Sequence, residues 1–239
     1  MRRLKWIIAL PLAALLLVLG GTWAYINVLH DDAPARLTLG GTVSDNLPAT
    51  SATTAAGASA TVPASFDGTW VAASDSQAGY RVKEVLFGQS TEAVGRTSNV
   101  DGALTISGTT VESAAISIDL ASVASDESLR DGQFRGRIMN VAQYPTATFT
   151  LKSPIDLGTL PADGATVTVP ATGELTLHGT KKTVTVDVTA KRSGGTISVN
   201  GTIPVVFADY GIPNPSFGPA SVEDHGEIEF LVTFTKSNS

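Results

Sequence analysis

Apolar and polar residues alternate with a period of two along most of the chain after residue 66. In "ESAAISIDL" every second residue is apolar, and the pattern recurs in "TATFTLKS", "GELTLHG", "KTVTVDVTAK", "TISVNGTIPVVF" and "GEIEFLVTF". Successive side chains of a β-strand point to opposite faces, so this period predicts strands with one buried and one solvated face. Turn sequences such as "PADGAT" and "RSGGT" separate the segments, which predicts antiparallel hairpins.

Eight or more such strands have to bury their apolar faces together, either in a closed barrel or in two packed sheets. Alternation alone does not distinguish these two architectures. The residues on the predicted inward faces are mostly Val, Ile, Leu and Ala, and aromatic residues make up 6% of the chain. Because small lining residues leave space inside an eight-stranded barrel, we predict an all-β antiparallel barrel of about eight strands with room for a ligand.

Two segments depart from the alternation. Residues 125–140, "SDESLRDGQFRGRIMN", have helix-compatible spacing and polar residues at their start, which predicts one short helix. Residues 207–221, "FADYGIPNPSFGPAS", contain too much proline and glycine for a strand. We therefore expect a long loop there, with room for one helical turn.

Residues 1–30 have the pattern of a membrane anchor. Arg2, Arg3 and Lys5 precede an uncharged stretch from Trp6 to Ile26. About 21 helical residues at roughly 1.5 Å each span about 31 Å, the thickness of the hydrocarbon core of a bilayer. The basic flank predicts a single-pass protein of the cell membrane with its C-terminal domain outside the cytoplasm. The alternative is a cleaved signal peptide, although its apolar core is usually shorter and ends in small residues.

The remainder of the chain divides into a predicted linker, residues 31–65, and a predicted domain, residues 66–239. The linker is rich in Ala, Thr, Ser, Gly and Pro and has no hydrophobic period, which is typical of a flexible tether. About 35 flexible residues predict an average spacing of roughly 30–35 Å between the membrane and the domain.

Composition and motifs exclude several functional classes. The chain carries a formal net charge of −6 without a basic stripe, so it is poorly suited to bind nucleic acid. It has no cysteine, no nucleophile elbow and no histidine pair at metal-binding spacing. No catalytic residue, metal or cofactor is therefore expected. His225 with its acidic neighbours Glu223, Asp224 and Glu227 leaves a weak cation site as an alternative.

Five short motifs follow one another along the domain. They are Trp70 near the domain start, Arg130 with Asp131 opening the short helix, Tyr144 with Pro145 before a strand, a G-x-L-T-x-x-G hairpin at residues 173–179 and a D-Y-G-I loop at residues 209–212. This ordered set resembles the YceI-like family of bacterial, extracytoplasmic, lipocalin-like barrels, whose late loop reads D-F/Y-G-I. Each motif is weak alone, but the ordered set covers residues 66–236 and is fairly specific.

The resemblance implies a protein that is not an enzyme and that holds an isoprenoid lipid, either a polyisoprenoid or an isoprenoid quinone, inside the barrel. Burying one five-carbon unit is worth a gross ~3–4 kcal/mol at ~0.8 kcal/mol per methylene-sized group. A few units therefore offset the several kcal/mol that association costs. The chain departs from the family at Gln77-Ala78, where members often have His-Ser, and at Glu84, where they often have a histidine. It also has Ile138-Met139 where members usually have a Phe-Phe pair.

The predicted ligand-binding residues are inward-facing strand residues together with residues of the helix at 125–140. On a helix, Arg130, Phe134 and Arg137 share one face, an arrangement that fits a lid over the barrel. We predict Phe134 on the ligand chain and Arg137 near a polar or anionic head group, with Arg130 and Asp131 clamping the helix to the rim. The full predicted set is Tyr80, Val82, Ile116, Ile118, Phe134, Arg137, Phe149, Leu175, Leu177, Ile203, Val205 and Phe207.

Two other functions are compatible with the sequence. A β-sandwich or a filled barrel would bind a protein or a cell-envelope polymer through its loops and would contain no long apolar cavity. An enzyme acting on a prenyl ligand is the third hypothesis, although no catalytic constellation supports it. The expected partners are thus an isoprenoid lipid and the cytoplasmic membrane, with homodimer formation left open.

Overall fold

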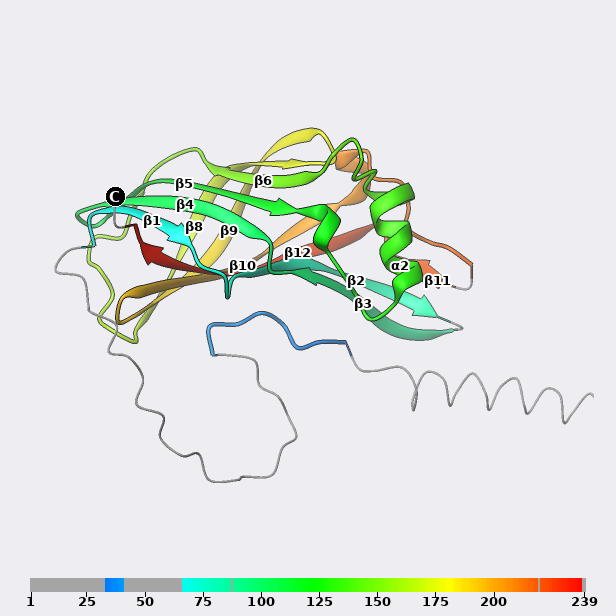
Figure 1. Ribbon diagram of the computed structural model, residues 1–239, viewed down its shortest axis with the longest axis horizontal. Helices are drawn as coiled ribbons and strands as arrows, with labels where there is room; N and C mark the ends of the chain where they lie inside the picture. The colour runs from blue at the N-terminus through cyan, green and yellow to red at the C-terminus, as the bar shows by residue number, and fades with distance from the viewer. Residues whose placement is uncertain (1–32, 41–65, 87, 219, 238–239) are drawn as a thin grey trace, which may run out of the picture.

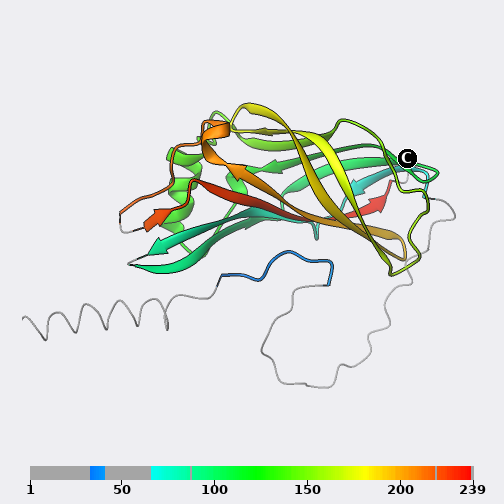
Figure 2. The ribbon, with the colours of Figure 1, turned by 180° about the vertical axis from the view of Figure 1, so that it is seen from behind.

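The computed structural model describes residues 33–40, 66–86, 88–218 and 220–237. In these ranges the strands form one 12-stranded antiparallel sheet that curls into a barrel (Figures 1 and 2). Eight strands, in the order β1-β4-β5-β6-β8-β9-β10-β12, close the barrel because β12 pairs with β1 as well as with β10. The prediction of a closed antiparallel barrel of about eight strands is therefore confirmed.

The elements have the following bounds. The closing strands are β1 (Gly68–Ala72), β4 (Val100–Ser107), β5 (Thr110–Asp119), β6 (Thr146–Leu151), β8 (Thr166–Leu177), β9 (Thr180–Ser193), β10 (Thr196–Val206) and β12 (His225–Lys236). The additional strands are β2 (Gln77–Leu86), β3 (Gln89–Thr97), β7 (Ile155–Asp156) and β11 (Ala220–Val222). The helical segments are η2 (Leu120–Ser122), α2 (Ser128–Gln133), the π-helical turn η3 (Phe134–Ile138) and η4 (Phe207–Tyr210).

A break between β1 and β2 opens one end of the barrel. Both strands lie beside β12, but β1 then pairs with β4 whereas β2 pairs with β3. At the break, the fully buried Ser76 replaces strand pairing, because its hydroxyl accepts a hydrogen bond from the backbone N–H of Thr233 at 3.1 Å. The far edge of β3 makes only an isolated bridge between Arg96 and Ala124. Residues 120–140 cover the gap that this leaves.

The covering segment contains the predicted short helix. Residues 128–133 are α-helical and continue directly into the π-helical turn η3. Asp131 fixes the entry into the helix, because its carboxylate accepts hydrogen bonds from the backbone N–H and the hydroxyl of Ser125 at 2.9 and 2.7 Å. The loop expected at residues 207–221 begins with the single turn η4 and leads into β11. We call the end of the barrel where α2 and β11 lie the mouth end (Figure 1).

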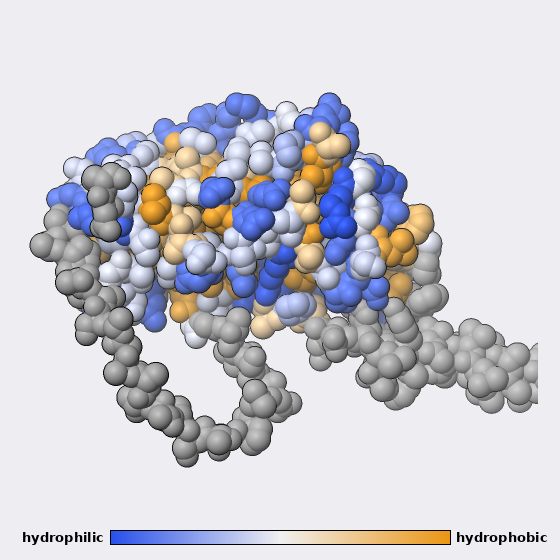
Figure 3. Space-filling view, in the orientation of Figure 1, coloured by the Kyte–Doolittle hydropathy of each residue, from blue (hydrophilic) through white to orange (hydrophobic). Residues whose placement is uncertain are grey.

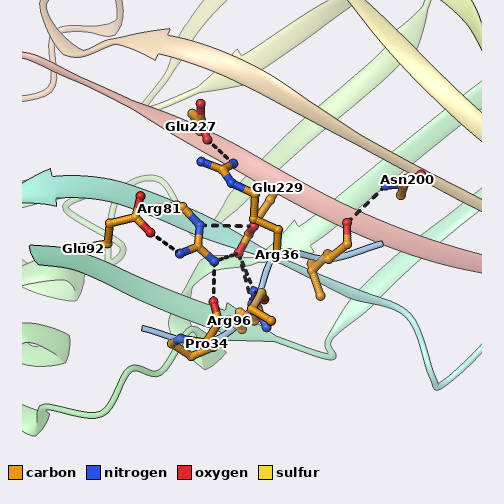
Figure 4. A network of polar contacts seen from close by, with 10 residues as sticks. Pro34, Arg36, Arg81, Glu92, Arg96, Asn200, Glu227 and Glu229 are labelled. Atoms are coloured by element: carbon orange, nitrogen blue, oxygen red, sulfur yellow. Dashed lines mark hydrogen bonds and ion pairs between the residues drawn. The ribbon is translucent and has the colours of Figure 1, made fainter. Parts of the chain in front are cut away.

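Residues 33–40, which we call the strap, lie along the outside of the barrel (Figure 4). Leu37 is 7% exposed, and three backbone carbonyls of the strap accept hydrogen bonds from barrel side chains. This differs from the flexible linker expected for residues 31–65, because arginine and asparagine donors on the barrel hold the backbone of the strap. The rest of that linker, apart from the strap, lies outside the described residues.

None of the helices in the described part of the chain has the length and apolar character that crossing a bilayer requires. The anchor expected at residues 1–30 lies outside the described residues.

Candidate ligand cavity inside the barrel

Two adjoining cavities occupy the barrel interior. The inner cavity has a volume of about 180 Å³, and the mouth cavity, at the mouth end, has a volume of about 370 Å³. Ile118, Ala147 and Ile228 line both, so the two spaces lie end to end along the barrel. The mouth cavity alone falls within the roughly 300–1,000 Å³ that is typical of small-molecule sites.

The inner cavity is lined almost entirely by aliphatic and aromatic side chains. They come from alternate positions of β5, β8, β9, β10 and β12, such as Ile116, Val169, Val188 and Val199. Several of these side chains point inward and are still only partly buried, because they face the cavity and not a packed core. At the closed end, the guanidinium of Arg192 lies 4.4 Å from the ring centroid of Phe66. Such a lining offers an apolar chain contact area without competing hydrogen-bond partners.

The mouth cavity combines an apolar wall with a few charged groups. Its lining includes aliphatic residues from β2, β10 and the 120–140 segment, and also Glu84, Glu127, Arg130 and Glu227. This polarity gradient, apolar inside and charged at the mouth end, matches a ligand with an apolar chain and a polar head.

The structure gathers the predicted binding residues around these two cavities, with one exception. Ile116, Phe149, Leu175 and Ile203 line the inner cavity, and Ile118 lines both. The mouth cavity is lined by Tyr80, Val82, Phe134, Leu177, Val205 and Phe207. Arg137 lines neither. Contact of these residues with a ligand stays a prediction.

Tyr80 lies flat in the wall of the mouth cavity. Its ring stacks on Phe134 with the centroids 5.1 Å apart, and it lies over the backbone of Gly95, its cross-strand partner on β3. A Cβ atom at Gly95 would be 2.4 Å from the Tyr80 ring, so only glycine allows this close approach. Burial of the phenol raises the pKa of Tyr80 to about 12.

Glu84 and Arg130 form an ion pair in the wall of the same cavity. Glu84, on β2, is 7% exposed, and its carboxylate lies 3.3 Å from the Arg130 guanidinium. Arg130 also pairs with Asp126 one helical turn earlier. The pair joins α2 to β2 across the gap beside β3. Arg130 was expected at the rim and Glu84 as a departure from the family, but no sequence pattern predicts a contact between two residues that lie 46 positions apart.

Arg137, the predicted head-group residue, points to a loop. Its guanidinium donates to the backbone carbonyls of Asn214 and Pro215 at 3.0 Å each and to that of Ser216 at 3.5 Å. Its Nε donates to Gln133 at 3.1 Å. In the structure, therefore, Arg137 holds the loop that precedes β11.

The acidic cluster around His225 shows no arrangement that would hold a metal. His225 contacts Asp224 at 2.8 Å and Glu223 at 3.2 Å, and the hydrogen bond to Asp224 raises the pKa of the histidine. Across the described residues, no group of three or more histidine, aspartate or glutamate side chains is placed to bind a metal ion.

A closed antiparallel barrel with an apolar, end-to-end cavity is the architecture of barrels that enclose one small ligand. The YceI-like domain family model matches residues 70–234, and the chain belongs to that family. No curated protein matches the chain.

Three solved structures illustrate the similarity. A polyisoprenoid binding domain from Saccharophagus degradans is 20% identical, with a TM-score of 0.58 over 71% of this chain and 98% of that chain. BcnA from Burkholderia cenocepacia is 24% identical, with a TM-score of 0.49 over 69% and 95% of the two chains. A YceI protein from Campylobacter jejuni is 17% identical, with a TM-score of 0.48 over 58% and 82%. At these identities the likeness concerns the fold.

Proposed function

We propose that this protein is a non-enzymatic lipid-binding protein that holds the chain of an isoprenoid lipid in the two adjoining cavities of its barrel. The observation that carries this proposal is the continuous apolar lining, in which Ile118, Ala147 and Ile228 belong to both cavities. Family membership supports it, since a Saccharophagus degradans domain of the same fold is described as polyisoprenoid-binding. A filled core would instead favour recognition of a polymer through the loops.

The charges of the mouth cavity favour an uncharged head group, such as a quinone or an alcohol. Two glutamates, Glu84 and Glu127, line this cavity with a single arginine, whereas the carboxylate of Glu227 pairs with Arg36 of the strap at 2.5 Å. That arginine, Arg130, is paired with two carboxylates, and Arg137 is engaged with backbone carbonyls. A phosphate would therefore meet net negative charge and no spare guanidinium, which costs binding free energy.

The proposed place of action is the outer face of the cytoplasmic membrane. The uncharged stretch from Trp6 to Ile26 and its basic flank support an N-terminal anchor with the barrel outside the cytoplasm. Anchoring would keep the cavity close to the bilayer in which isoprenoid lipids dissolve.

The test is native mass spectrometry of the full-length protein, purified in detergent from its own host, with extraction of any bound lipid. We expect one isoprenoid lipid without a phosphate per chain. After delipidation, a prenyl alcohol should rebind more tightly than the prenyl phosphate of the same chain length. Failure of every prenyl compound to bind would refute the proposal, and tighter binding of the phosphate would refute the uncharged head group alone.

A further inference from the structure

Side chains on the outer face of the barrel fix the course of the strap by hydrogen bonds to its backbone. The Arg81 guanidinium donates to the carbonyl of Pro34 at 2.6 Å, and that of Arg96 donates to the carbonyl of Ala35 at 2.5 Å (Figure 4). Further along, the side-chain amide of Asn200 donates to the carbonyl of Leu37 at 3.1 Å. These contacts follow the strap from β2 and β3 to β10.

The barrel surface beneath the strap carries a cluster of buried charged side chains. Arg81 is 4% exposed and Glu229 is 2% exposed, although both lie on the outer face of the barrel. Their charges are matched, because Glu229 contacts Arg81 at 3.3 Å and Arg96 at 2.7 Å, and Arg81 also contacts Glu92 at 2.6 Å. The Nη2 atom of each arginine contacts Glu229 and also donates to the strap. Such additional hydrogen bonds lower the cost of burying a charge pair.

The strap runs along the barrel with its N-terminal end toward the mouth end. Arg81, which binds Pro34, pairs across the sheet with Glu227 near the start of β12. Asn200, which binds Leu37, pairs with Leu231 further along β12. Because β12 begins at the mouth end with His225, which pairs with Val206, residue 33 is the strap residue nearest to the mouth end. The N-terminal end of the strap therefore lies toward α2 and β11.

Chain length then limits how far the mouth end can lie from a membrane. From Ile26, the last residue of the apolar stretch, to Ala33 there are about seven Cα steps, which reach at most ~25 Å. Along β2, the five residues from Arg81 to the last strand residue, Leu86, rise about 17 Å. If the N-terminal stretch lies in a bilayer, about 17 Å of the ~25 Å reach is used in passing the mouth end of the barrel. Less than about 10 Å is then left between the mouth end and the bilayer surface.

Exposed apolar side chains gather at the same end. Leu129 on α2 is 65% exposed and Phe217, in the loop before β11, is 53% exposed. Val85 and Val206, at the mouth ends of β2 and β10, are also exposed. Among the described residues, Val71 is the other large hydrophobic side chain exposed to this degree. Figure 3 shows hydrophobic surface at the end of the molecule that carries α2. We call Leu129, Phe217, Val85 and Val206 the mouth patch.

We propose that the mouth patch contacts the bilayer that holds the N-terminal segment, and that docking of the strap fixes this orientation of the barrel. A lipid would then pass between bilayer and cavity without exposing its chain to water. The free-energy cost of such exposure scales with the apolar area exposed. This inference rests on the anchored lipid-binding function proposed above and adds the orientation of the barrel and the surface that meets the membrane.

The test uses single-cysteine variants of the full-length protein, which has no cysteine of its own. Val85→Cys and Leu129→Cys place a fluorophore in the mouth patch, and Ser193→Cys places it on the β9–β10 turn at the opposite end. Each protein is reconstituted into phosphatidylcholine–phosphatidylglycerol vesicles that carry a nitroxide quencher at the head group. We expect at least threefold stronger quenching at the two mouth sites than at Ser193, and flotation of all three variants with the vesicles.

A pair of strap variants then tests whether the strap fixes the orientation. Leu37→Asp puts a carboxylate at a strap position that is 7% exposed and should release the strap, whereas Thr38→Asp adds the same charge at an exposed neighbouring position. Leu37→Asp should remove the difference in quenching between the two ends while flotation persists, and Thr38→Asp should keep it. Equal quenching at both ends in the parent protein, or an unchanged difference in Leu37→Asp, overturns the inference and leaves lipid binding standing. Loss of flotation in the parent overturns both the anchor and the orientation, and lipid extraction then reports separately on the cavity.

Discussion

At the scale of single residues, the wall of the mouth cavity depends on a charge pair that has little access to water. Glu84 is 7% exposed, and among the described residues its ion-pair partner is Arg130 on α2. Removing one member of a buried pair leaves an uncompensated charge, which is more costly than removing both. Because Arg130 keeps a 19% exposed side chain, solvent screening reduces this cost from the value for a fully buried pair.

We predict strong coupling between Glu84 and Arg130. Arg130→Met and Glu84→Leu should each lower the free energy of unfolding by about 2 kcal/mol, whereas the double variant should lose clearly less than the sum. Urea unfolding of all four proteins measures the coupling. If the two single losses simply add, the pair does not hold the helix to the barrel.

Tyr80 makes a second prediction, concerning pH. Its folded-state pKa of about 12 lies above the ordinary value of 10.0 because burial disfavours the phenolate. The unfolded chain therefore releases this proton first, so the contribution of Tyr80 to stability is complete below pH 10 and is lost as pH rises through about 12. Tyrosinate absorbance should show a late-ionising component that is absent in Tyr80→Phe, a variant that keeps the stacking on Phe134. A titration curve unchanged by this substitution would contradict the buried position of the phenol.

At the scale of secondary-structure elements, the sequence predicted the strands and the face on which each strand residue lies, because both follow from local residue patterns. The period of two placed Ile116, Ile118 and Leu177 on inward faces, because a strand fixes the face of each residue. The sequence pattern did not predict the break between β1 and β2, because the break depends on a hydrogen bond between Ser76 and Thr233, which lie far apart along the chain. Docking of the strap was also beyond prediction, because a segment rich in small and polar residues is held by arginines remote in sequence.

The loop before β11 provides the element-scale prediction. The three carbonyl contacts of Arg137 should be the main restraint of this loop. Arg137→Ala should therefore increase amide hydrogen exchange at Asn214, Ser216 and Phe217 by roughly fivefold, corresponding to a local loss of about 1 kcal/mol. Arg137→Lys should not restore protection, because one ammonium cannot reproduce a fork of donors. Arg135→Ala, which removes a contact to the Val123 carbonyl, serves as the control. Unchanged exchange in Arg137→Ala would mean that the loop is held by its own contacts, such as Ser216 with Asn214.

At the scale of the whole molecule, lipid capacity depends on the passage between the two cavities. Ile118 lines both spaces, whereas Leu177 lines only the mouth cavity and is 5% exposed. A large side chain at Ile118 would extend into open space and divide the interior. The same change at Leu177 would enter a packed wall, where overpacking costs about 1–3 kcal/mol.

The last prediction therefore compares Ile118→Trp with Leu177→Trp in the full-length protein. Ile118→Trp should keep the melting temperature close to that of the parent while excluding long isoprenoid chains, so that native mass spectrometry finds only shorter ones, held in the mouth cavity. Leu177→Trp should lower the melting temperature more and reduce binding of short and long chains alike. If Ile118→Trp binds the same range of chain lengths as the parent, the ligand chain does not run past Ile118. If both variants unfold, the interior is filled and cannot be the lipid site.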